Sequence, residues 1–287
     1  MTGTIIKGIG SFYTVMTEHG DFLTLKAPKK LRSMKLTPTV GDKVECGLSH
    51  DGDFIEGILE RKNILLRPPV SNIDRLCIVI SVGKPKPDLL MLDKMLIFAL
   101  SQDISPAIIA NKADEGEFGE RKDYEREGFL VLSTSAVTGE GREALSALIS
   151  RGTTCFAGQS AVGKSSLINL LYPDFELKTG TLSERTERGK HTTRRVELFP
   201  TGSGAILDTP GFSLLDSFAM EPSELSSYYP LIKAAGERCR FSACSHISEP
   251  DCAVKELLES GEISRGRYER YLKIYFELSE RFKHRFD

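Results

Sequence analysis

The sequence predicts an α/β protein in three parts, with a small all-β unit before the α/β domain and a helical unit after it. Three textures along the chain support this prediction. Short alternating apolar and polar runs come first, fully apolar runs alternating with helical patterns follow, and a charged, helical stretch ends the chain. These textures are typical of a β-barrel, of a parallel sheet covered by helices, and of a helical module. The expected boundaries are residues 1–66, 67–215 and 216–287.

The first unit is predicted to be a five-stranded OB-type barrel, because short alternating runs at 12–15, 22–25, 44–46 and 54–55 are broken by Gly and Asp. A basic stretch lies within this unit and has no acidic residue. It contains Lys26, Lys29, Lys30, Arg32 and Lys35. Such a loop suits contact with phosphates, and a solvated loop kept soluble by its lysines is the alternative on charge alone.

The second unit is predicted to contain a doubly wound parallel sheet. Its apolar runs at 76–82, 107–110 and 129–132 are short enough for strands, and helical patterns at 88–100 and 142–149 separate or follow them. Strands that are buried on both faces read as continuous apolar runs, which is the pattern seen here. The same texture resumes after residue 153, so we expect one α/β domain from about residue 67 to 215.

Composition excludes several classes of protein. The chain has 287 residues, is 40% hydrophobic and carries a net charge of −2. It has no apolar run of the roughly 18 residues that would suggest a membrane span, and no apolar segment of signal-peptide type near Met1. We therefore expect a cytosolic protein without membrane attachment. Since the net charge is close to zero, any nucleic acid would have to bind to local basic patches.

A complete P-loop is the strongest motif in the chain. Residues 158–165 read GQSAVGKS, between a strand-like run and a helix-like run. Glycines in such a loop let backbone N–H groups surround phosphates at a helix N-terminus; Lys164 would bridge the β- and γ-phosphates, and the Ser165 hydroxyl would coordinate Mg²⁺. The residues expected to contact the nucleotide are Gly158, Gln159, Ser160, Ala161, Val162, Gly163, Lys164, Ser165 and Ser166.

The segment 111–114, which reads NKAD and follows a strand-like run, predicts that the base is guanine. The Asp114 carboxylate can accept hydrogen bonds from the N1–H and the exocyclic amine of guanine, whereas adenine lacks that amine and has an acceptor at N1. The Asn111 amide can meet the acceptor edge of the base. The aliphatic stem of Lys112 can cover its flat face.

A second base-contacting turn is predicted at 133–136, which reads STSA. Ser135 lies in this turn, and the backbone N–H of Ala136 would reach the guanine O6. Both base-reading turns precede the P-loop in the chain, whereas ordinary GTPases have the P-loop first. The sequence therefore predicts a circularly permuted P-loop GTPase domain, which a parallel α/β fold with neighbouring ends tolerates.

The two remaining GTPase elements follow the P-loop. The segment DTPG begins at Asp208, which would hold Mg²⁺ through water, and ends at Gly211, whose N–H would sense the γ-phosphate. Upstream of it, the segment GKHTT contains Thr192 and Thr193, either of which could close over Mg²⁺ when GTP is present. The permutation cuts the domain just after the Asp208 loop. The last unit is therefore tethered to a segment whose conformation depends on the γ-phosphate.

Three cysteines and one histidine cluster in the last unit, at Cys239, Cys244, His246 and Cys252. Three thiols and an imidazole form the ligand set of a closed tetrahedral zinc site, so we expect one structural Zn²⁺ per chain. A disulfide framework is disfavoured by the odd count and by the expected compartment, and free buried cysteines would be less clustered. The other cysteines lie in apolar surroundings and are predicted to be buried free thiols. They are Cys46, Cys77 and Cys155.

Taken together, NKAD, STSA, GQSAVGKSS, GKHTT, DTPG and the Cys/Cys/His/Cys cluster, after an OB-like barrel, resemble the bacterial circularly permuted ribosome-assembly GTPases of the RsgA or YjeQ family. The resemblance spans essentially the whole chain. It implies a cytoplasmic monomer that binds GTP, GDP and the small ribosomal subunit with its rRNA late in assembly. It also implies that the subunit stimulates hydrolysis. The basic residues at 26–35, 185–195 and 281–285 are consistent with rRNA contacts.

The resemblance points to His191 as the residue that positions the attacking water, and an RNA-contact or structural role is the alternative. Phe212 follows DTPG where Ras-type GTPases carry a water-orienting glutamine, so intrinsic hydrolysis is expected to be slow until a partner completes the site. Two other functions remain open on the sequence. One is an RNA-binding module that hydrolysis resets, and the other is a GTPase that acts on a different RNA or protein partner.

Overall fold

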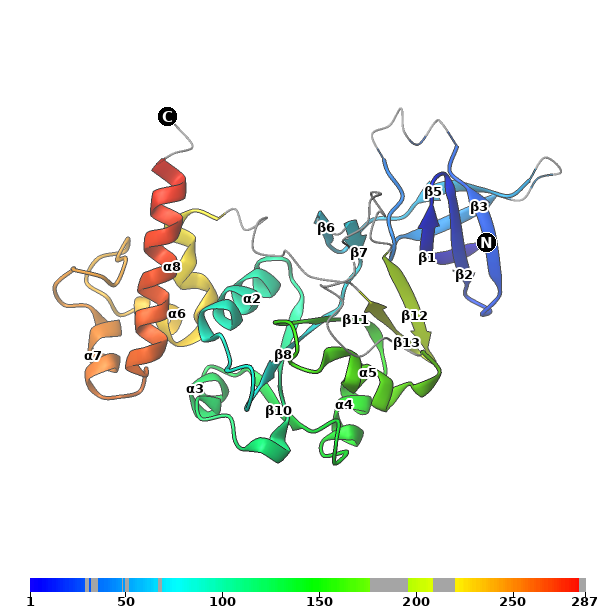
Figure 1. Ribbon diagram of the computed structural model, residues 1–287. Helices are drawn as coiled ribbons and strands as arrows, with labels where there is room; N and C mark the ends of the chain where they lie inside the picture. Colours follow the sequence, from blue (N-terminus) through cyan, green and yellow to red (C-terminus); the bar gives the residue numbers. More distant parts are fainter. Residues whose placement is uncertain are drawn as a thin grey trace, which may run out of the picture.

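The protein has three parts arranged in a row, as the computed structural model in Figure 1 shows: a barrel, a central sheet flanked by helices, and a helical part at the carboxyl end. The structure describes residues 1–28, 31, 36–47, 49, 52–66, 69–175, 196–208 and 220–283. No helix in these ranges combines the length and the apolar character that a membrane crossing requires.

The first part is a closed five-stranded barrel, which confirms the prediction of an OB-type unit. Its strands are β1 (Thr2–Ile9), β2 (Phe12–Thr17), β3 (Phe22–Lys26), β4 (Lys43–Gly47) and β5 (Phe54–Ile58). They pair in the order β1-β2-β3-β5-β4, and β4 closes the barrel on β1. Inward side chains such as Ile5, Val15, Leu25 and Ile55 are fully buried, as the alternating pattern requires.

The central sheet has the strand order β10-β9-β8-β11-β13-β12. Its strands are β8 (Arg75–Ser81), β9 (Ser105–Asn111), β10 (Leu130–Thr134), β11 (Gly152–Ala157), β12 (Glu197–Thr201) and β13 (Gly204–Asp208). The pairs from β10 to β13 are parallel, as predicted, but β12 is antiparallel to β13. The prediction of an entirely parallel sheet is wrong at this edge, because a tight turn joins these two strands and such a turn reverses the chain.

Helices cover both faces of this sheet, which confirms the doubly wound α/β class. They are α2 (Leu89–Ser101), α3 (Arg121–Arg126), α4 (Arg142–Ile149), α5 (Lys164–Leu171) and the 3-10 turns η1 (Ala113–Glu115) and η2 (Pro173–Phe175). Along β8, Ile78 and Ile80 belong to the same core as α2. Cys77 and Val79 belong to the core of α4 and α5 on the opposite face.

Three cysteines that the sequence predicts as buried thiols, Cys46, Cys77 and Cys155, are buried and form no disulfide. Burial raises the pKa of Cys77 to about 12. That side chain therefore remains a neutral thiol and packs as a small apolar group.

The barrel and the central sheet are continuous, because β1 pairs with β12 in an 11-stranded sheet. The pairing places Lys7 opposite Glu197, and the two side chains form an ion pair of 2.7 Å. A short hairpin of β6 (Ile64–Leu66) and β7 (Pro69–Ser71) lies on the chain between the two parts. The sequence patterns do not predict this junction.

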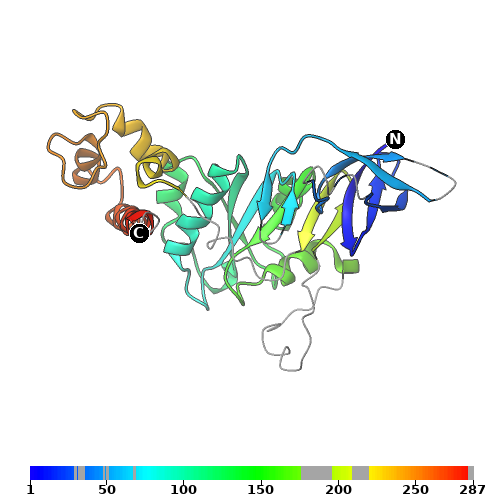
Figure 2. The same cartoon turned by 90° about the horizontal axis from the view of Figure 1, so that it is seen from above.

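The last part consists of short helices packed on α8, and it lies at the far end of the molecule from the barrel (Figure 2). Its helices are η4 (Pro222–Tyr228), α6 (Pro230–Gly236), α7 (Ala253–Glu259) and α8 (Arg265–Lys283). Their core includes Leu225, Ile232, Val254 and Ile274, together with Ile97 from α2. Helix α8 confirms the charged, helical stretch that the sequence predicts at the end of the chain.

Candidate functional site

The predicted nucleotide-binding segments lie at one edge of the central sheet. Ser81, Asn111 and Thr134 are aligned across β8, β9 and β10, so the segments that follow these strands begin side by side. The chain runs outward from β8 to β10 and then returns to β11 on the other side of β8. Ligands of open α/β sheets bind where the strand order reverses in this way, at the carboxyl ends of the strands. The P-loop follows β11 at that position.

The P-loop fits closely against the neighbouring strands because two of its glycines lack a side chain. Gly158 has φ +137° and Gly163 has φ +95°, a region that favours glycine. A Cβ on Gly158 would lie 2.1 Å from the carbonyl oxygen of Val79, and one on Gly163 would lie 2.3 Å from Nδ2 of Asn111. The loop therefore contacts both the central strand and the predicted base-reading segment.

Lys164 begins α5, and its ammonium group lies over the P-loop. Its Nζ donates hydrogen bonds to the carbonyl oxygens of Gly158 (2.8 Å) and Gln159 (2.6 Å). Burial lowers the pKa of Lys164. The first-turn N–H groups of a helix have no partner within the helix, so the start of α5, which includes Ser165 and Ser166, suits an anion. Phosphate oxygens could replace the two carbonyl acceptors of Lys164.

The two predicted base-reading turns are joined to one another. The Ser135 hydroxyl donates a hydrogen bond to Asp114 Oδ1 and accepts bonds from the N–H groups of Val137 (3.2 Å) and Thr138 (3.1 Å). Ser135 is buried and Asp114 is exposed. The Ser135 hydroxyl thus orients one oxygen of the Asp114 carboxylate. The carboxylate itself is exposed to solvent, and Ala136 follows Ser135 in the neighbouring turn. This arrangement can present acceptors to the donor edge of a base.

Asn111 makes contacts within the protein that the sequence does not predict. Its side chain is 1% exposed; its Nδ2 donates to the Val162 carbonyl (2.8 Å), and its Oδ1 accepts from the Thr134 hydroxyl (3.2 Å). The amide therefore ties the base-reading strand to the P-loop, and its second N–H remains as a donor for a base. Lys112 adopts φ +64° and its Nζ donates to the Lys84 carbonyl.

The predicted Mg²⁺ and catalytic residues are only partly described. Asp208 ends β13 next to β11, so its backbone lies one strand away from the P-loop. His191, Thr192, Thr193 and Gly211 lie outside the described residues. Among the residues expected to act on phosphate or metal, the structure therefore positions Lys164 and Ser165 at the start of α5.

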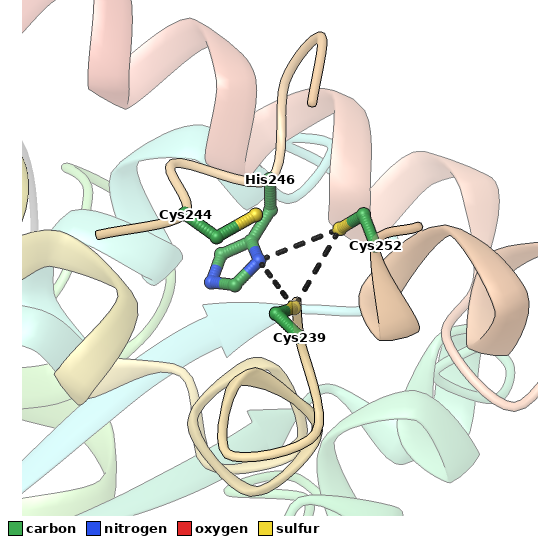
Figure 3. Close-up of side chains that lie close together, drawn as sticks. All are labelled: Cys239, Cys244, His246 and Cys252. Atoms are coloured by element: carbon green, nitrogen blue, oxygen red, sulfur yellow. Dashed lines mark hydrogen bonds between the residues drawn. The ribbon is translucent and has the colours of Figure 1, made fainter. Parts of the chain in front are cut away.

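A second site lies in the helical part, where Cys239, Cys244, His246 and Cys252 converge (Figure 3). Their ligand atoms all lie within 4.8 Å of one another. His246 Nδ1 is 3.6 Å from Cys239 Sγ and 3.5 Å from Cys252 Sγ, and these two sulfur atoms are 3.9 Å apart. With metal–sulfur bonds of about 2.3 Å and metal–nitrogen bonds of about 2.0 Å, a tetrahedral site has edges of about 3.5 to 3.8 Å. The cluster has the shape of a metal centre.

The ionisation of this cluster also suits a cation. Burial and the neighbouring Cys252 and Cys239 raise the pKa of Cys244 to about 12, although a backbone hydrogen bond at His246 opposes the shift. Burial lowers the pKa of His246, which keeps the imidazole neutral as a metal ligand must be. Crowded thiols of this kind become thiolates when a metal ion supplies the opposing charge.

Residues that sequence reasoning does not single out hold the loop that carries His246. Glu249 accepts a hydrogen bond from the N–H of Ser245 (2.7 Å), and such bonds lower the pKa of Glu249 to about 2 despite the opposing effect of burial. From α8, the Tyr268 hydroxyl donates to the His246 carbonyl (2.6 Å) and the Tyr271 hydroxyl donates to the Ser245 carbonyl (2.9 Å). In the sequence, the position of Glu249 within the Cys/His segment is a weak indication that it supports the cluster. Nothing in the sequence indicates this role for Tyr268 and Tyr271.

Comparison with known proteins matches most of the chain to one family of GTPases. The family description RsgA GTPase matches residues 58–218, and RsgA N-terminal domain matches residues 2–55. A protein of Halalkalibacterium halodurans named small ribosomal subunit biogenesis GTPase RsgA is 42% identical over 293 residues, which cover 99% of both chains. A protein of the same name from Caldanaerobacter subterraneus is 42% identical over 290 residues, 99% of this chain and 98% of its own.

Two solved structures are similar over nearly the whole length. YjeQ from Thermotoga maritima has a TM-score of 0.81 and 34% identity, covering 96% of this chain and 98% of its own. YloQ, described as a circularly permuted GTPase, has a TM-score of 0.81 and 34% identity, covering 98% of this chain and 95% of its own. The permuted order of motifs therefore has a counterpart in a solved structure.

Proposed function

Because the chain belongs to the RsgA family of GTPases, we propose that it binds the small ribosomal subunit during late maturation of that subunit. There it hydrolyses GTP to GDP and phosphate, and the subunit stimulates this reaction. The family makes the chain a GTP hydrolase, and its relatives are named for biogenesis of the small subunit. The observation that carries the proposal is the convergence of the P-loop with the two turns at Asp114 and Ser135, at the edge where the strand order reverses.

The nucleotide is proposed to bind between these turns and the P-loop. Asp114 accepts hydrogen bonds from the donor edge of guanine, and the Ala136 N–H donates to the guanine O6. Lys112 covers the flat face of the base after its ammonium group leaves the Lys84 carbonyl. Phosphates contact the backbone of the P-loop and Lys164. The full set of proposed contacts is Asn111, Lys112, Asp114, Ser135, Ala136, Gly158, Gln159, Ser160, Ala161, Val162, Gly163, Lys164, Ser165 and Ser166.

Mg²⁺ is proposed to bind with GTP and to neutralise charge on its phosphates. Hard oxygen donors suit this ion, and the chain offers the Ser165 hydroxyl, the Asp208 carboxylate and the hydroxyl of Thr192 or Thr193. Lys164 would stabilise the charge that develops on the transferred group. Gly211 would contact the γ-phosphate, and His191 would orient the attacking water.

We propose that the metal of the Cys/His cluster is Zn²⁺, one ion per chain, with a structural role. Three thiolates and one imidazole in a closed tetrahedral arrangement suit this ion and leave no position open for water. The cation would hold α6, α7 and the loop between them together, because His246 is the one buried residue from Glu237 to Asp251. The proposed units are the barrel at 1–66, the GTPase domain at 67–215 and the zinc-binding domain at 216–287.

Replacing Cys252 by serine is expected to remove the metal, because a serine hydroxyl is a poor zinc ligand. Elemental analysis of purified protein should give about one zinc per chain for the wild type and far less for the variant. Cys77→Ser is the matched control, since Cys77 is buried in the central sheet and far along the chain from the cluster. A folded wild-type protein without metal would contradict this assignment.

Purified small subunits are expected to raise the rate of GTP hydrolysis by at least about tenfold, because Phe212 stands where a water-orienting glutamine is expected and a partner must complete the site. Steady-state phosphate release would be measured with small subunits, with large subunits as the control, and without ribosomal particles. His191→Ala should lose most of the stimulation. An unstimulated wild type would contradict the ribosomal assignment, whereas full stimulation of His191→Ala would remove only the role of that histidine.

We further propose that the protein is a cytoplasmic monomer that works without a membrane. The small subunit is assembled in the cytoplasm of bacteria, so a factor for its biogenesis is expected there. The proposed partner itself supplies the surface that a GTPase of this kind needs for activation, and no second copy of the chain is required.

A further inference from the structure

Helix α2 connects the nucleotide site with the metal-binding part of the protein. It lies between the central sheet and the helical part (Figures 1 and 2). Leu92, Met95 and Leu96 belong to the core beneath the sheet, whereas Ile97 belongs to the core of the helical part together with Ile274 of α8. A helix that is buried on opposite sides is held in place by both of its neighbours.

Buried charges join α2 to α8 alongside these apolar contacts. Asp93 of α2 is fully buried, and its carboxylate accepts hydrogen bonds from Arg270 Nε (2.7 Å) and the Tyr124 hydroxyl (2.7 Å). Arg267 of α8 donates two bonds to Glu127, from Nε at 2.7 Å and from Nη2 at 3.0 Å. Its Nη1 lies 2.5 Å from Asp93 Oδ1 in an ion pair without hydrogen-bond geometry.

Arg267 is the centre of this cluster. Its side chain is 2% exposed, and its guanidinium lies 4.9 Å from the ring centre of Tyr124 and 4.3 Å from that of Tyr229. If α8 moved away from α2, Asp93 and Glu127 would lose their cations and the core shared by Ile97 and Ile274 would open, which is costly. The helical part is therefore expected to stay docked on α2 and α3 in every nucleotide state.

The other end of α2 contacts the P-loop. Asp88, which caps the N-terminus of α2, donates its backbone N–H to Oε1 of Gln159 (3.3 Å), and its carboxylate accepts from the N–H of Met91 (2.9 Å). Gln159 is also the residue whose carbonyl accepts a hydrogen bond from Lys164. Phosphates that displace Lys164 from this carbonyl would alter the surroundings of Gln159, and Asp88 would be the first residue of α2 to respond.

We propose that Arg267 is a positioning residue that fixes α8 to α2. Through this contact, a structural change caused by nucleotide binding at the P-loop passes along α2 to the metal-binding part. This inference rests on the proposed GTP site and assigns a route by which that site is regulated. It differs from the connection that the sequence suggests, in which the segment between Asp208 and Met220 transmits the signal along the chain. In the proposed route the signal passes through packed side chains.

Hydrogen exchange of the full-length, metal-loaded protein tests the route, with GDP, with a non-hydrolysable GTP analogue and without nucleotide. Nucleotide is expected to slow exchange in the P-loop, in α2 and in α8 of the wild type by at least about threefold. Arg267→Lys keeps a positive charge but cannot form the two-bond contact with Glu127 or stack between the tyrosine rings. In this variant the slowing should persist in the P-loop and α2 and disappear from α8. Arg265→Lys is the matched control, because the Arg265 side chain on the same helix is 87% exposed.

Metal content and thermal unfolding show whether Arg267→Lys remains folded. If Arg267→Lys does not fold, Lys94→Met is used instead. This variant removes the ion pair of Lys94 with Glu277 and leaves the buried cluster of Arg267 intact. In this variant α8 should lose part of its response to nucleotide. Undiminished slowing of α8 in the variant used would overturn the proposal. Loss of the α8 response after insertion of Gly-Ser residues between Phe212 and Met220, beyond the proposed γ-phosphate contact at Gly211, would also overturn it. A wild type whose P-loop does not respond to either nucleotide would count against the GTP site itself, whereas a responding P-loop with an unresponsive α8 would count only against this route.

Discussion

Replacing Lys164 by alanine is expected to lower the rate of GTP hydrolysis by at least about a hundredfold, the loss typical when a group that stabilises transition-state charge is removed. Lys164 begins α5 and is held over the P-loop by the carbonyl groups of Gly158 and Gln159. Its ammonium group would bridge the β- and γ-phosphates, where negative charge develops during transfer. No other lysine or arginine belongs to the P-loop segment from 158 to 166, so the loop has no substitute for this charge.

The measurement is single-turnover hydrolysis at saturating GTP, with and without small subunits. Lys122→Ala is the control, because Lys122 is an exposed lysine on α3. Ser165→Ala should also lose most of its activity, and raising the Mg²⁺ concentration should restore it in part, since the lost hydroxyl is proposed to bind that ion. Normal hydrolysis by both the Lys164 and the Ser165 variants would show that the P-loop is not the phosphate site.

Asp114→Asn is expected to weaken GTP binding by about a hundredfold or more, because a site built to hydrogen-bond a polar edge strongly rejects a mismatched one. The Ser135 hydroxyl orients Asp114 through Oδ1. An asparagine can accept the same bond with its carbonyl oxygen, which leaves its NH₂ group facing the N1–H and the amine of guanine. Xanthine has a carbonyl in place of that amine, so the variant should bind xanthosine triphosphate more tightly than the wild type does.

Equilibrium titration with fluorescent GDP, GTP and xanthosine triphosphate measures this change in specificity. Glu117→Gln is the control, since Glu117 is an exposed carboxylate in the same loop. Because asparagine is close to aspartate in size and keeps the contact with Ser135, the variant is expected to remain folded. Unchanged affinity for GTP would place the base pocket elsewhere.

The sequence predicts most of the elements that build the nucleotide site, because each depends on a local pattern. An apolar run followed by GQSAVGKS and a helical pattern is sufficient to predict β11, the P-loop and α5. The Cys/His cluster is likewise visible in the spacing of Cys239 to Cys252, since four metal-ligating side chains in so short a segment can meet at one point.

The sequence does not predict how side chains divide their hydrogen bonds. Asn111 illustrates this limit, because its residue type and its neighbours suggest a contact with the base. In the structure its buried amide joins Val162 to Thr134. The choice depends on how close β9 lies to the P-loop, which Gly163 permits by lacking a side chain.

By itself, the sequence determined the class of each unit, the guanine-nucleotide motifs with their permuted order, and the Cys/His ligand set. Only the tertiary structure decided the contacts between units, such as the pairing of β1 with β12 and the cluster of Arg267 with Asp93 and Glu127. The physical reason is distance along the chain. Lys7 and Glu197 are 190 residues apart, and Arg267 and Glu127 are 140 apart. Periodicity and motif spacing report on residues that are neighbours in the chain. These ion pairs form only after folding has brought distant segments together, because buried charges are then stable only when they are paired.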